Sequence, residues 1–222
     1  MGRQDPRAPA LLDLGTATLG ESGARVMPPR VRPAWPGARL AGPAFPVRCS
    51  PADNLPLHVA AATAPAGWVL VADVGGLAER GYWGEVLTTA ACARELEGLV
   101  IDGGVRDVDA LEAHGFPVFA TAVALRGATK ELPGTAGLAT VVAGIRVSPG
   151  DWVVGDRDGV VVLPAGSFDE IHERAEARAE KERGMFDALE SGSTTVELLG
   201  LDASPVRTEE IGTGSVGTDG IP

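Results

Sequence analysis

The chain has 222 residues, a net charge of −11, 45% hydrophobic residues and 22% charged residues. This balance is typical of globular proteins and excludes a chain that is disordered throughout. The acidic charge argues against nucleic acid as a partner, because nucleic-acid-binding proteins usually carry a basic surface. No apolar run approaches the roughly 20 residues of a membrane helix, and no signal peptide is recognisable. We therefore expect a soluble, cytoplasmic protein that binds neither nucleic acid nor membranes.

The first elements expected along the chain are a helix and an irregular strand. Leucines recur at roughly helical spacing over residues 11–19, which predicts a short helix. Residues 38–49 (ARLAGPAFPVRC) predict a strand. Its prolines, Pro43 and Pro46, favour a place at a sheet edge or a bulge, because proline has no amide hydrogen for a ladder.

Alternating helices and strands follow. A helix is expected over residues 54–63 with Asn54 as its N-cap, and then a strand buried on both faces over residues 67–74 (GWVLVADV). Residues 85–97 predict the most regular helix, with Val86 and Ala90 among its inward-facing residues. A strand, a helix and a strand are expected next, over residues 99–102, 107–114 and 116–122.

The pattern changes after residue 140. Strands expected over residues 140–147, 152–155 and 160–163 are joined by tight turns, which predicts a β-meander. One long charged helix is expected over residues 168–190, and the composition beyond residue 200 predicts disorder. The order of elements predicts one α/β domain over residues 1–199 and a disordered tail over residues 200–222.

Residues 99–107 (LVIDGGVRD) are the most informative stretch for function. A buried strand ends in Asp102, two glycines make a turn, and Arg106 and Asp107 begin the next helix; ligands of open α/β sheets gather at such strand ends. Arg106 can hold a carboxylate or an enolate oxygen through two parallel hydrogen bonds, and Asp107 can offer an oxygen to Mg²⁺. Alternatively, Asp107 is only a helix cap and Arg106 only a surface ion pair.

Residues 84–87 (GEVL) are a second candidate site, at the start of the most regular helix. The free amides of a helix N-terminus bind anions, and Gly84 allows a ligand to approach the backbone. Alternatively, this segment is a plain flexible loop that leads into a helix. Gly75 and Gly76 do not complete a G-x-G-x-x-G fingerprint, so we do not expect a dinucleotide cofactor.

Lysines and histidines limit the choice of chemistry. The chain has two lysines, Lys130 and Lys181. An aldolase that forms a Schiff base needs a lysine in a desolvated pocket, so a metal-assisted route is the better starting hypothesis for any aldolase activity. His58, His114 and His172 are not at metal-ligand spacing, and we expect surface or capping roles for them.

Several stretches, in this order and spacing, resemble one known family. They are residues 53–120, with GYWGEVL and GGVRD, residues 150–164, and the EKE of the last helix. Over roughly residues 10–190 the chain resembles the 4-hydroxy-4-methyl-2-oxoglutarate aldolase/oxaloacetate decarboxylase family, which shares its fold with the regulator of ribonuclease E activity. The resemblance implies a compact α/β sandwich of the swivelling-domain type, a homotrimer or homohexamer, and an active site between subunits.

The resemblance also implies roles for individual residues. The backbone of Gly84, Glu85, Val86 and Leu87 would bind the substrate carboxylate, and Arg106 would contact the pyruvate unit. Asp107 would ligate a divalent metal, Mg²⁺ first and Mn²⁺ or Co²⁺ as alternatives. Glu85, and Glu182 of a neighbouring subunit, would hold metal-bound water, although Glu85 stands where the family has a shorter aspartate.

The implied activity is that of a lyase that cleaves a 4-carboxy-2-keto acid to pyruvate through a pyruvate enolate. Retro-aldol cleavage of 4-hydroxy-4-methyl-2-oxoglutarate also needs a base, expected to be a metal-linked water polarised by Glu85 or Glu182, whereas decarboxylation of oxaloacetate does not. The competing interpretation is a non-catalytic regulator that binds ribonuclease E. Regulators of that type lack an aspartate after the arginine, so Asp107 favours the enzyme.

Overall fold

The computed structural model describes residues 5–207, which fall into two compact units divided between Ala179 and Glu180. The domain boundary expected after residue 199 stays a prediction. Residues 201–207 are exposed, and the part of the expected disordered tail over residues 208–222 lies outside the described residues. Among residues 5–207, no helix combines the length and the apolarity needed to cross a membrane.

The larger unit alternates helices and strands. Its helices are α1 (Arg7–Glu21), α2 (Leu55–Thr63), α3 (Glu85–Ala93), α4 (Val108–Ala113) and the first turns of α5 (Phe168–Glu190), with a short 3-10 helix at Ala165–Ser167. Its strands are β1 (Arg25–Val26), β2 (Arg32–Pro33), β3 (Leu40–Arg48), β4 (Val69–Asp73), β5 (Gly81–Trp83), β6 (Gly98–Asp102), β7 (Gly104–Val105), β8 (Val118–Ala120), β9 (Ala122–Val123), β10 (Thr135–Ala136), β11 (Thr140–Val142), β12 (Ile145–Val147), β13 (Trp152–Gly155) and β14 (Val160–Leu163). The smaller unit holds the end of α5 and α6 (Thr195–Leu199).

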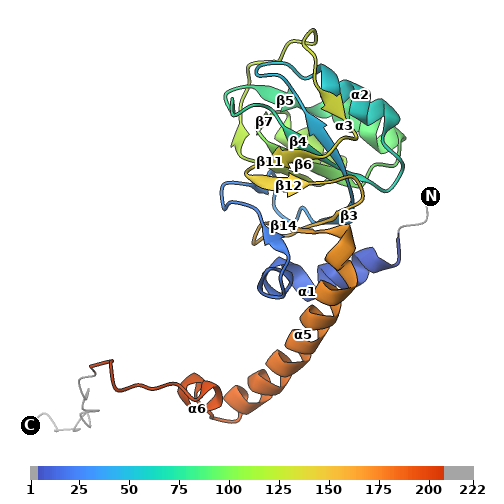
Figure 1. Ribbon diagram of the computed structural model, residues 1–222. Coiled ribbons are helices and arrows are strands. Elements are labelled where there is room, and N and C mark those ends of the chain that lie inside the picture. The colour runs from blue at the N-terminus through green and yellow to red at the C-terminus, as the bar shows by residue number, and fades with distance from the viewer. Residues whose placement is uncertain (1–4, 208–222) are drawn as a thin grey trace, which may run out of the picture. The chain divides into compact units, whose positions relative to one another are not determined.

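The core of the larger unit is a curled sheet of nine strands, in the order β1-β14-β13-β3-β4-β6-β8-β2, with β10 paired to β3 (Figure 1). The strands β3, β4, β6 and β8 run parallel, and antiparallel strands join them on both sides. The apolar run of β4 is buried on both faces, as the sequence predicts. The predicted fold class, α/β with a long helix near the C-terminus, is therefore confirmed, and α5 has the predicted bounds 168–190. The predicted β-meander is only partly correct. Ala143 and Gly144, both with positive φ, turn the expected strand over residues 140–147 into the separate hairpin β11–β12, and β13 pairs with β14 and β3.

Strand β3 differs from the expectation. Its prolines predict an edge or a bulge, but β3 lies in the interior of the sheet. It pairs antiparallel with β13 over residues 40–43 and parallel with β4 over residues 44–48, so Pro43 falls where the strand changes partner. Pro46 takes part through its carbonyl oxygen, which accepts a hydrogen bond of 2.8 Å from the amide of Gly137. Proline is tolerated at both positions because no carbonyl group of a neighbouring strand requires the missing amide hydrogen there.

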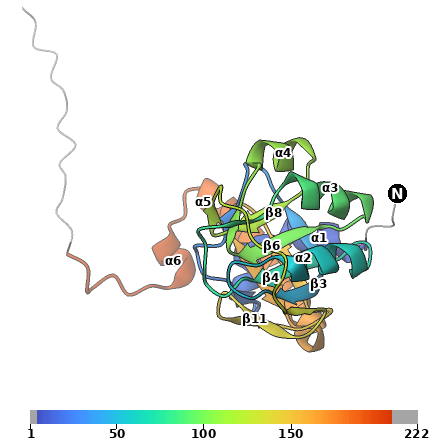
Figure 2. The same ribbon diagram turned by 90° about the horizontal axis from the view of Figure 1, so that it is seen from above.

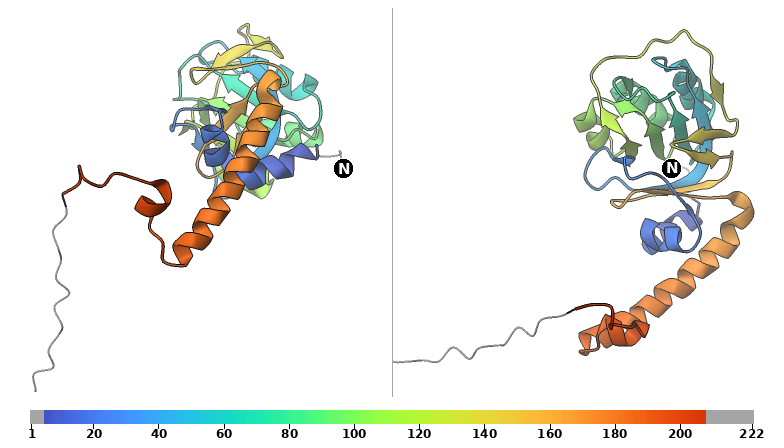
Figure 3. Two further views of the ribbon diagram at one scale, coloured as in Figure 1. Left: turned by 60° about the horizontal axis from the view of Figure 1, so that its bottom comes forward. Right: turned by 60° about the vertical axis from the view of Figure 1, so that its left-hand side comes forward.

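Helices and a hairpin cover the central strands. The helices α2, α3 and α4 lie along one face (Figure 2), and an apolar cluster that includes Leu57, Leu87 and Leu111 joins them to it. The hairpin β11–β12 covers the other face through Val142 and Val147. Helix α1 packs against β3, β13 and β14 at the outer side of the curled sheet (Figure 3). Because both faces are covered, polar side chains gather at strand ends and in loops.

The buried face of α3 differs from the face that the sequence predicts. Leu87, Thr88 and Ala91 are buried, whereas Val86 is 77% exposed. Thr88 faces inward because its hydroxyl accepts a hydrogen bond of 2.7 Å from the indole of Trp83. The predicted inward orientation of Val86 and Ala90 is therefore wrong.

A second sheet, of the short parallel strands β5, β7 and β9, carries the glycine-rich segments. Its strands lie so close to neighbouring backbone that a Cβ at Gly81 would lie 2.5 Å from the carbonyl oxygen of Ala124. A Cβ at Gly104 would lie 2.5 Å from that of Arg80. Glycine is required at both positions. Arg106 directly follows β7, so the predicted strand-end site belongs to this small sheet rather than to the central one.

Candidate active site

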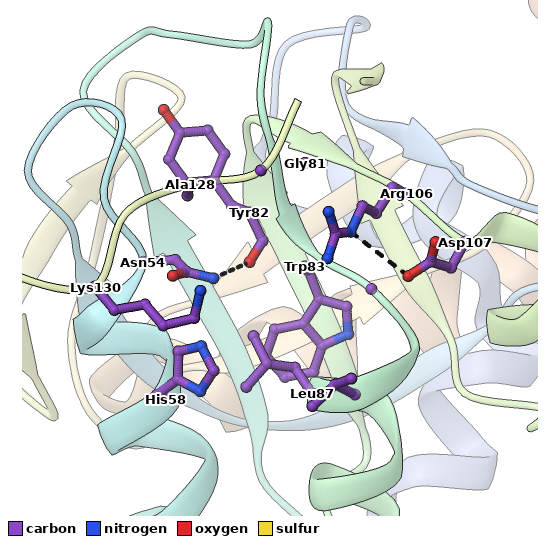
Figure 4. Close-up of a pocket in the computed structure, with 13 residues that line it drawn as sticks. Asn54, His58, Gly81, Tyr82, Trp83, Leu87, Arg106, Asp107, Ala128 and Lys130 are labelled. Atoms are coloured by element: carbon purple, nitrogen blue, oxygen red, sulfur yellow. Dashed lines mark hydrogen bonds and ion pairs between the residues drawn. The ribbon is translucent and has the colours of Figure 1, made fainter. Parts of the chain in front are cut away.

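A cavity of about 180 Å³ lies where most of the predicted site residues meet (Figure 4). Of these residues, Gly84, Val86, Leu87, Arg106 and Asp107 line it. The cavity is surrounded by the starts of α2 and α3, the strand β5, the end of β7 and the loop over residues 127–130. It is smaller than the roughly 300–1,000 Å³ pockets that take drug-sized ligands, so it suits a small metabolite.

Asp107 has a left-handed backbone conformation, with φ 56° and ψ 40°, which is uncommon for a residue other than glycine. It precedes α4, but its side chain makes no cap hydrogen bond to that helix. Its Oδ2 instead accepts a hydrogen bond of 3.1 Å from the amide of Glu85 at the start of α3. The alternative interpretation of Asp107 as a side-chain cap of the next helix is therefore wrong. Its Oδ1 has no partner among the described residues and is open to a ligand.

Arg106 is fixed through its backbone and presents its guanidinium to the cavity. Its amide donates to the carbonyl oxygen of Trp83 at 2.9 Å, which ties the end of β7 to β5. Its Nε lies 3.6 Å from Oδ2 of Asp107, and the side chain is 42% exposed. No described residue accepts a hydrogen bond from its two Nη groups, so they can bind a carboxylate or a keto oxygen.

Gly84 leaves space for the side chains of Asp107 and Arg106. Its backbone is extended, so its dihedral angles do not require glycine. A Cβ at this position, however, would collide with Oδ2 of Asp107 and would lie 3.0 Å from Cγ of Arg106. Any other residue would therefore displace one of these two side chains.

The first turn of α3 presents free backbone amides. Gly84 has no side chain to cap the helix, and the amides of Val86 and Leu87 have no acceptor within a helix that begins at Glu85. The partial positive charge at this helix end favours an anion such as a carboxylate. The side chain of Glu85 does not line the cavity; its Oε1 lies 4.0 Å from Nε2 of His114. The catalytic role expected for Glu85 stays a prediction.

Sequence reasoning missed the opposite wall of the cavity, which holds Asn54, His58 and Lys130 (Figure 4). Asn54 stands at the N-cap position of α2, as the sequence predicts, but its side chain does not cap the helix, because its Nδ2 donates to the carbonyl oxygen of Tyr82 at 2.7 Å. Its Oδ1 and the Nε2 of His58 are buried and have no hydrogen-bond partner among the described residues. The surface or capping role expected for His58 is therefore wrong. Unpaired buried polar atoms are rare and call for an explanation, which a polar ligand would supply here.

The electrostatics of this wall keep His58 neutral. Burial lowers the pKa of His58, the positive charge of Lys130 lowers it further, and the negative charge of Asp53 opposes both. The sequence contains a signal for the wall, because Asn54 and His58 are four residues apart and so share a helix face. Lys130 is one of two lysines in the sequence, which also marks it as a candidate for binding an anion.

The residues present fit a divalent cation only together with a ligand. Residues 5–207 contain no cluster of three or more His, Cys, Asp or Glu side chains that could hold a metal ion. Asp107 offers one carboxylate with an open Oδ1. Mg²⁺ is commonly held by one or two carboxylates and fills its other positions with water and substrate oxygens. A chelating substrate would therefore complete the site.

Glu182, expected to act from a neighbouring subunit, lies on the part of α5 that belongs to the smaller unit. Its role stays a prediction. His114 ends α4 and His172 lies on α5, where it stacks on Phe168. Neither histidine lines the cavity.

Comparisons with known proteins show the family to which the chain belongs. A sequence model of the RraA-like family, described as Aldolase/RraA, matches residues 9–162. A protein of Halalkalibacterium halodurans, provisionally named 4-hydroxy-4-methyl-2-oxoglutarate aldolase, is 30% identical over 148 residues, which are 67% of this chain and 70% of that protein.

Solved structures show the same fold. An uncharacterised protein of Pseudomonas syringae pv. tomato is similar with a TM-score of 0.76 and 30% identity, over 87% of this chain and 96% of that one. The RNA-processing inhibitor RraA of Thermus thermophilis is similar with a TM-score of 0.62 and 28% identity, over 67% of this chain and 92% of that one. Since the family model spans more than half of the chain, the protein belongs to the RraA-like (Aldolase/RraA) family.

Proposed function

We propose that this protein is a divalent-metal-dependent lyase that cleaves a 4-carboxy-2-keto acid and releases pyruvate through its enolate. The candidate reactions are retro-aldol cleavage of 4-hydroxy-4-methyl-2-oxoglutarate and decarboxylation of oxaloacetate. The observation that carries the proposal is the meeting of Arg106, Asp107 and the uncapped start of α3 at one small cavity. The name of the relative from Halalkalibacterium halodurans supports aldolase chemistry.

The cavity offers positive charge to both ends of such a substrate. The amides of Val86 and Leu87 and the guanidinium of Arg106 can bind the carboxylate and the keto oxygen of the pyruvate part. Lys130, on the opposite wall, supplies a positive charge for the second carboxylate. A dicarboxylate therefore fits this arrangement better than a monocarboxylate.

The residues of the cavity would then assist cleavage of the C3–C4 bond. A divalent cation held by Asp107, Mg²⁺ or alternatively Mn²⁺ or Co²⁺, would supply Lewis-acid polarisation of the keto group. Arg106 would stabilise the negative charge that grows on the keto oxygen in the transition state. Decarboxylation releases CO₂ and needs no base, whereas the aldol reaction must also remove the proton of the C4 hydroxyl.

Lys130 raises the alternative of a Schiff-base aldolase, because its side chain lines the cavity. A lysine of that kind is normally desolvated, whereas Lys130 is exposed. Borohydride reduction in the presence of pyruvate separates the two routes. A Schiff base would leave a covalent adduct on Lys130 in the mass spectrum, and the metal-dependent route would leave none.

A second candidate function is that of a regulator that binds ribonuclease E. The similarity to the RNA-processing inhibitor RraA of Thermus thermophilis supports it. A shared fold does not decide function, because function depends on the site. The open Oδ1 of Asp107 beside the Nη groups of Arg106 favours the lyase over the regulator.

The experiment that tests the proposed lyase activity measures pyruvate release from 4-hydroxy-4-methyl-2-oxoglutarate and from oxaloacetate, with Mg²⁺ and with EDTA. We expect turnover of at least one substrate that EDTA removes and Mg²⁺ restores. Turnover that EDTA leaves unchanged would contradict the metal-dependent route. No turnover of either substrate by folded, Mg²⁺-supplied protein would contradict the lyase and favour the regulator.

We also propose that the protein assembles into a homotrimer or homohexamer, in which Glu182 of one subunit completes the site of another. The free edge of the small sheet supports an interface. Val123 and Leu125, on and after the edge strand β9, are 62% and 84% exposed. Exposed apolar side chains of this kind are typical of surfaces that a partner covers.

A further inference from the structure

His58 lines the cavity, and one of its ring nitrogens is unpaired among the described residues. Its Nε2 is buried and has no hydrogen-bond partner among residues 5–207. Its side chain lies on the wall that faces Arg106 and Asp107 across the cavity (Figure 4). A buried polar atom without a partner is unfavourable, so this atom is suited to pair with a group that a ligand brings in.

The layout of the cavity indicates which part of the substrate His58 would meet. Under the proposed function, Arg106, Asp107 and the start of α3 hold the carboxylate and keto group, which are C1 and C2. A substrate bound in this way extends across the cavity, so C4 and its hydroxyl lie on the side of His58 and Lys130. Lys130 has a long flexible side chain that can adjust when the second carboxylate enters.

We propose that His58 is the general base of the retro-aldol reaction, and that its Nε2 removes the proton of the C4 hydroxyl. This inference rests on the proposed function. The charged groups that face His58 are Lys130 and Asp53 on its own side, and Arg106 and Asp107 across the cavity. Burial and the charge of Lys130 lower the pKa of His58, so its imidazole is unprotonated and can accept a proton at neutral pH.

The step balances within the site. Nε2 takes the hydroxyl proton, the C4–O bond becomes a carbonyl, and the electron pair of the C3–C4 bond forms the enolate of pyruvate. The departing half leaves as a second 2-keto acid, which is also pyruvate for 4-hydroxy-4-methyl-2-oxoglutarate. The imidazolium then returns its proton to C3 of the enolate, which releases pyruvate and restores neutral His58. Oxaloacetate reaches the same enolate by losing CO₂ and has no hydroxyl proton to remove, and the proton that its enolate needs at C3 comes from water.

The two reactions therefore provide the test within one protein. We expect His58→Gln to lower kcat/KM for 4-hydroxy-4-methyl-2-oxoglutarate by about a hundredfold or more, with the rate of oxaloacetate decarboxylation close to that of wild type. Glutamine keeps a polar side chain but cannot act as the base. Pyruvate with Mg²⁺ should still raise the unfolding temperature of the variant, because the pyruvate-binding wall is unchanged. His172→Gln is the matched control, since His172 stacks on Phe168 in α5 and does not line the cavity.

Three results would overturn this assignment. They are an equal loss of both reactions in His58→Gln, no loss of the aldol reaction, and a wild-type protein that decarboxylates oxaloacetate but does not cleave the hydroxy acid. The first two would leave a water molecule as the base. A wild-type protein that catalyses neither reaction would contradict the proposed function itself, which is distinct from a failure confined to the variant.

Discussion

Asp53 and Glu131 are 78 residues apart in the chain, yet Oδ2 of Asp53 accepts a hydrogen bond of 2.6 Å from the amide of Glu131. The same carboxylate accepts from the hydroxyl of Thr129 at 2.8 Å and from the amide of Leu55 at 2.9 Å. It therefore fastens the loop that carries Lys130 to the start of α2. This buried carboxylate supports the second wall of the cavity, together with backbone hydrogen bonds that join Thr129 to Ala52 and Asn54.

Replacing Asp53 with Asn should lower the free energy of unfolding by about 2 kcal/mol, because hydrogen bonds to a carboxylate are lost or weakened. It should also raise KM, because Lys130 is held less firmly at the cavity. Chemical denaturation and steady-state kinetics measure the two effects. Asp151→Asn is the control, since Asp151 is buried and accepts two backbone hydrogen bonds but does not line the cavity. An unchanged KM in Asp53→Asn would show that the hydrogen bonds of Asp53 do not contribute to substrate binding.

The same carboxylate predicts a pH dependence of stability. Burial alone would raise the pKa of Asp53, but the hydrogen bonds from Glu131, Leu55 and Thr129 lower it from 3.8 to about 2. Because the pKa is lower in the folded than in the unfolded chain, the stabilisation is fully present above about pH 4 and is lost as the pH falls toward 2. We expect this acid-dependent part of the unfolding free energy to be missing in Asp53→Asn. An identical acid profile in wild type and variant would contradict the assignment.

Asp107→Ala should lower kcat/KM for both substrates by about a hundredfold to a thousandfold or more, because the carboxylate that would hold the metal is removed. The free energy of unfolding should fall by about 1 kcal/mol, because alanine tolerates the left-handed conformation less well than aspartate and the hydrogen bond to the amide of Glu85 is lost. Asp109→Ala is the control, because Asp109 is exposed in the first turn of α4. Substantial Mg²⁺-dependent turnover in Asp107→Ala would exclude it as the metal ligand.

Gly84→Ala should lower kcat/KM by about tenfold or more, because a methyl group displaces Asp107 or Arg106, and small misplacements of catalytic groups are costly. Gly166→Ala is the control, since a Cβ at Gly166 would meet no atom within 4 Å. Steady-state kinetics of both variants at saturating Mg²⁺ give the comparison. Wild-type activity in Gly84→Ala would mean that the positions of these two side chains are not critical.

Arg106→Lys should lower kcat/KM by about tenfold to a hundredfold, because lysine keeps the charge but cannot form two parallel hydrogen bonds. Arg94→Lys, at the exposed end of α3, should have no effect. Pyruvate binding should weaken in Arg106→Lys in the same proportion if the arginine holds the pyruvate unit. A loss in kcat/KM with unchanged pyruvate affinity would instead place its role in the transition state alone.

A shared active site predicts that two inactive variants can complement each other. Asp107→Ala and Glu182→Gln should each be inactive alone. When co-expressed they should form mixed oligomers in which about a quarter of the sites combine an intact Asp107 with an intact Glu182 from another subunit. Recovery of activity in the mixed preparation is the expected result. No recovery from oligomers shown to be mixed would contradict a site that uses both residues from different subunits.

Local patterns were enough to predict the longest helix and the buried strand β4. The apolar run that forms β4 and the charged periodicity that forms α5 each lie within one continuous segment. The strands β5, β7 and β9 have two or three residues each and exist only because distant glycine-rich segments pair. No local propensity signals a strand that short, because its stability comes from its neighbours.

The candidate site likewise has one part that local sequence predicts and one part that it does not. Arg106 and Asp107 are adjacent in the sequence, and a strand end before them marks the place where ligands gather. Asn54, His58 and Lys130 meet because the carboxylate of Asp53 and the backbone of residues 52–54 form hydrogen bonds with the distant segment over residues 129–131. A hydrogen bond between a carboxylate and a remote backbone amide leaves no pattern in the sequence.

The two walls of the cavity differ in how many amino-acid substitutions they can tolerate. On the side of the small sheet, a Cβ at Gly81 or Gly104 would lie 2.5 Å from a carbonyl oxygen, so no volume is spare. On the other side, Lys130 extends from an exposed loop, and Val86 at the mouth is 77% exposed. Libraries that aim at new substrates would vary these two positions and leave the glycines untouched. Evolution has the same freedom, so substrate range can drift while the bond-breaking chemistry is retained.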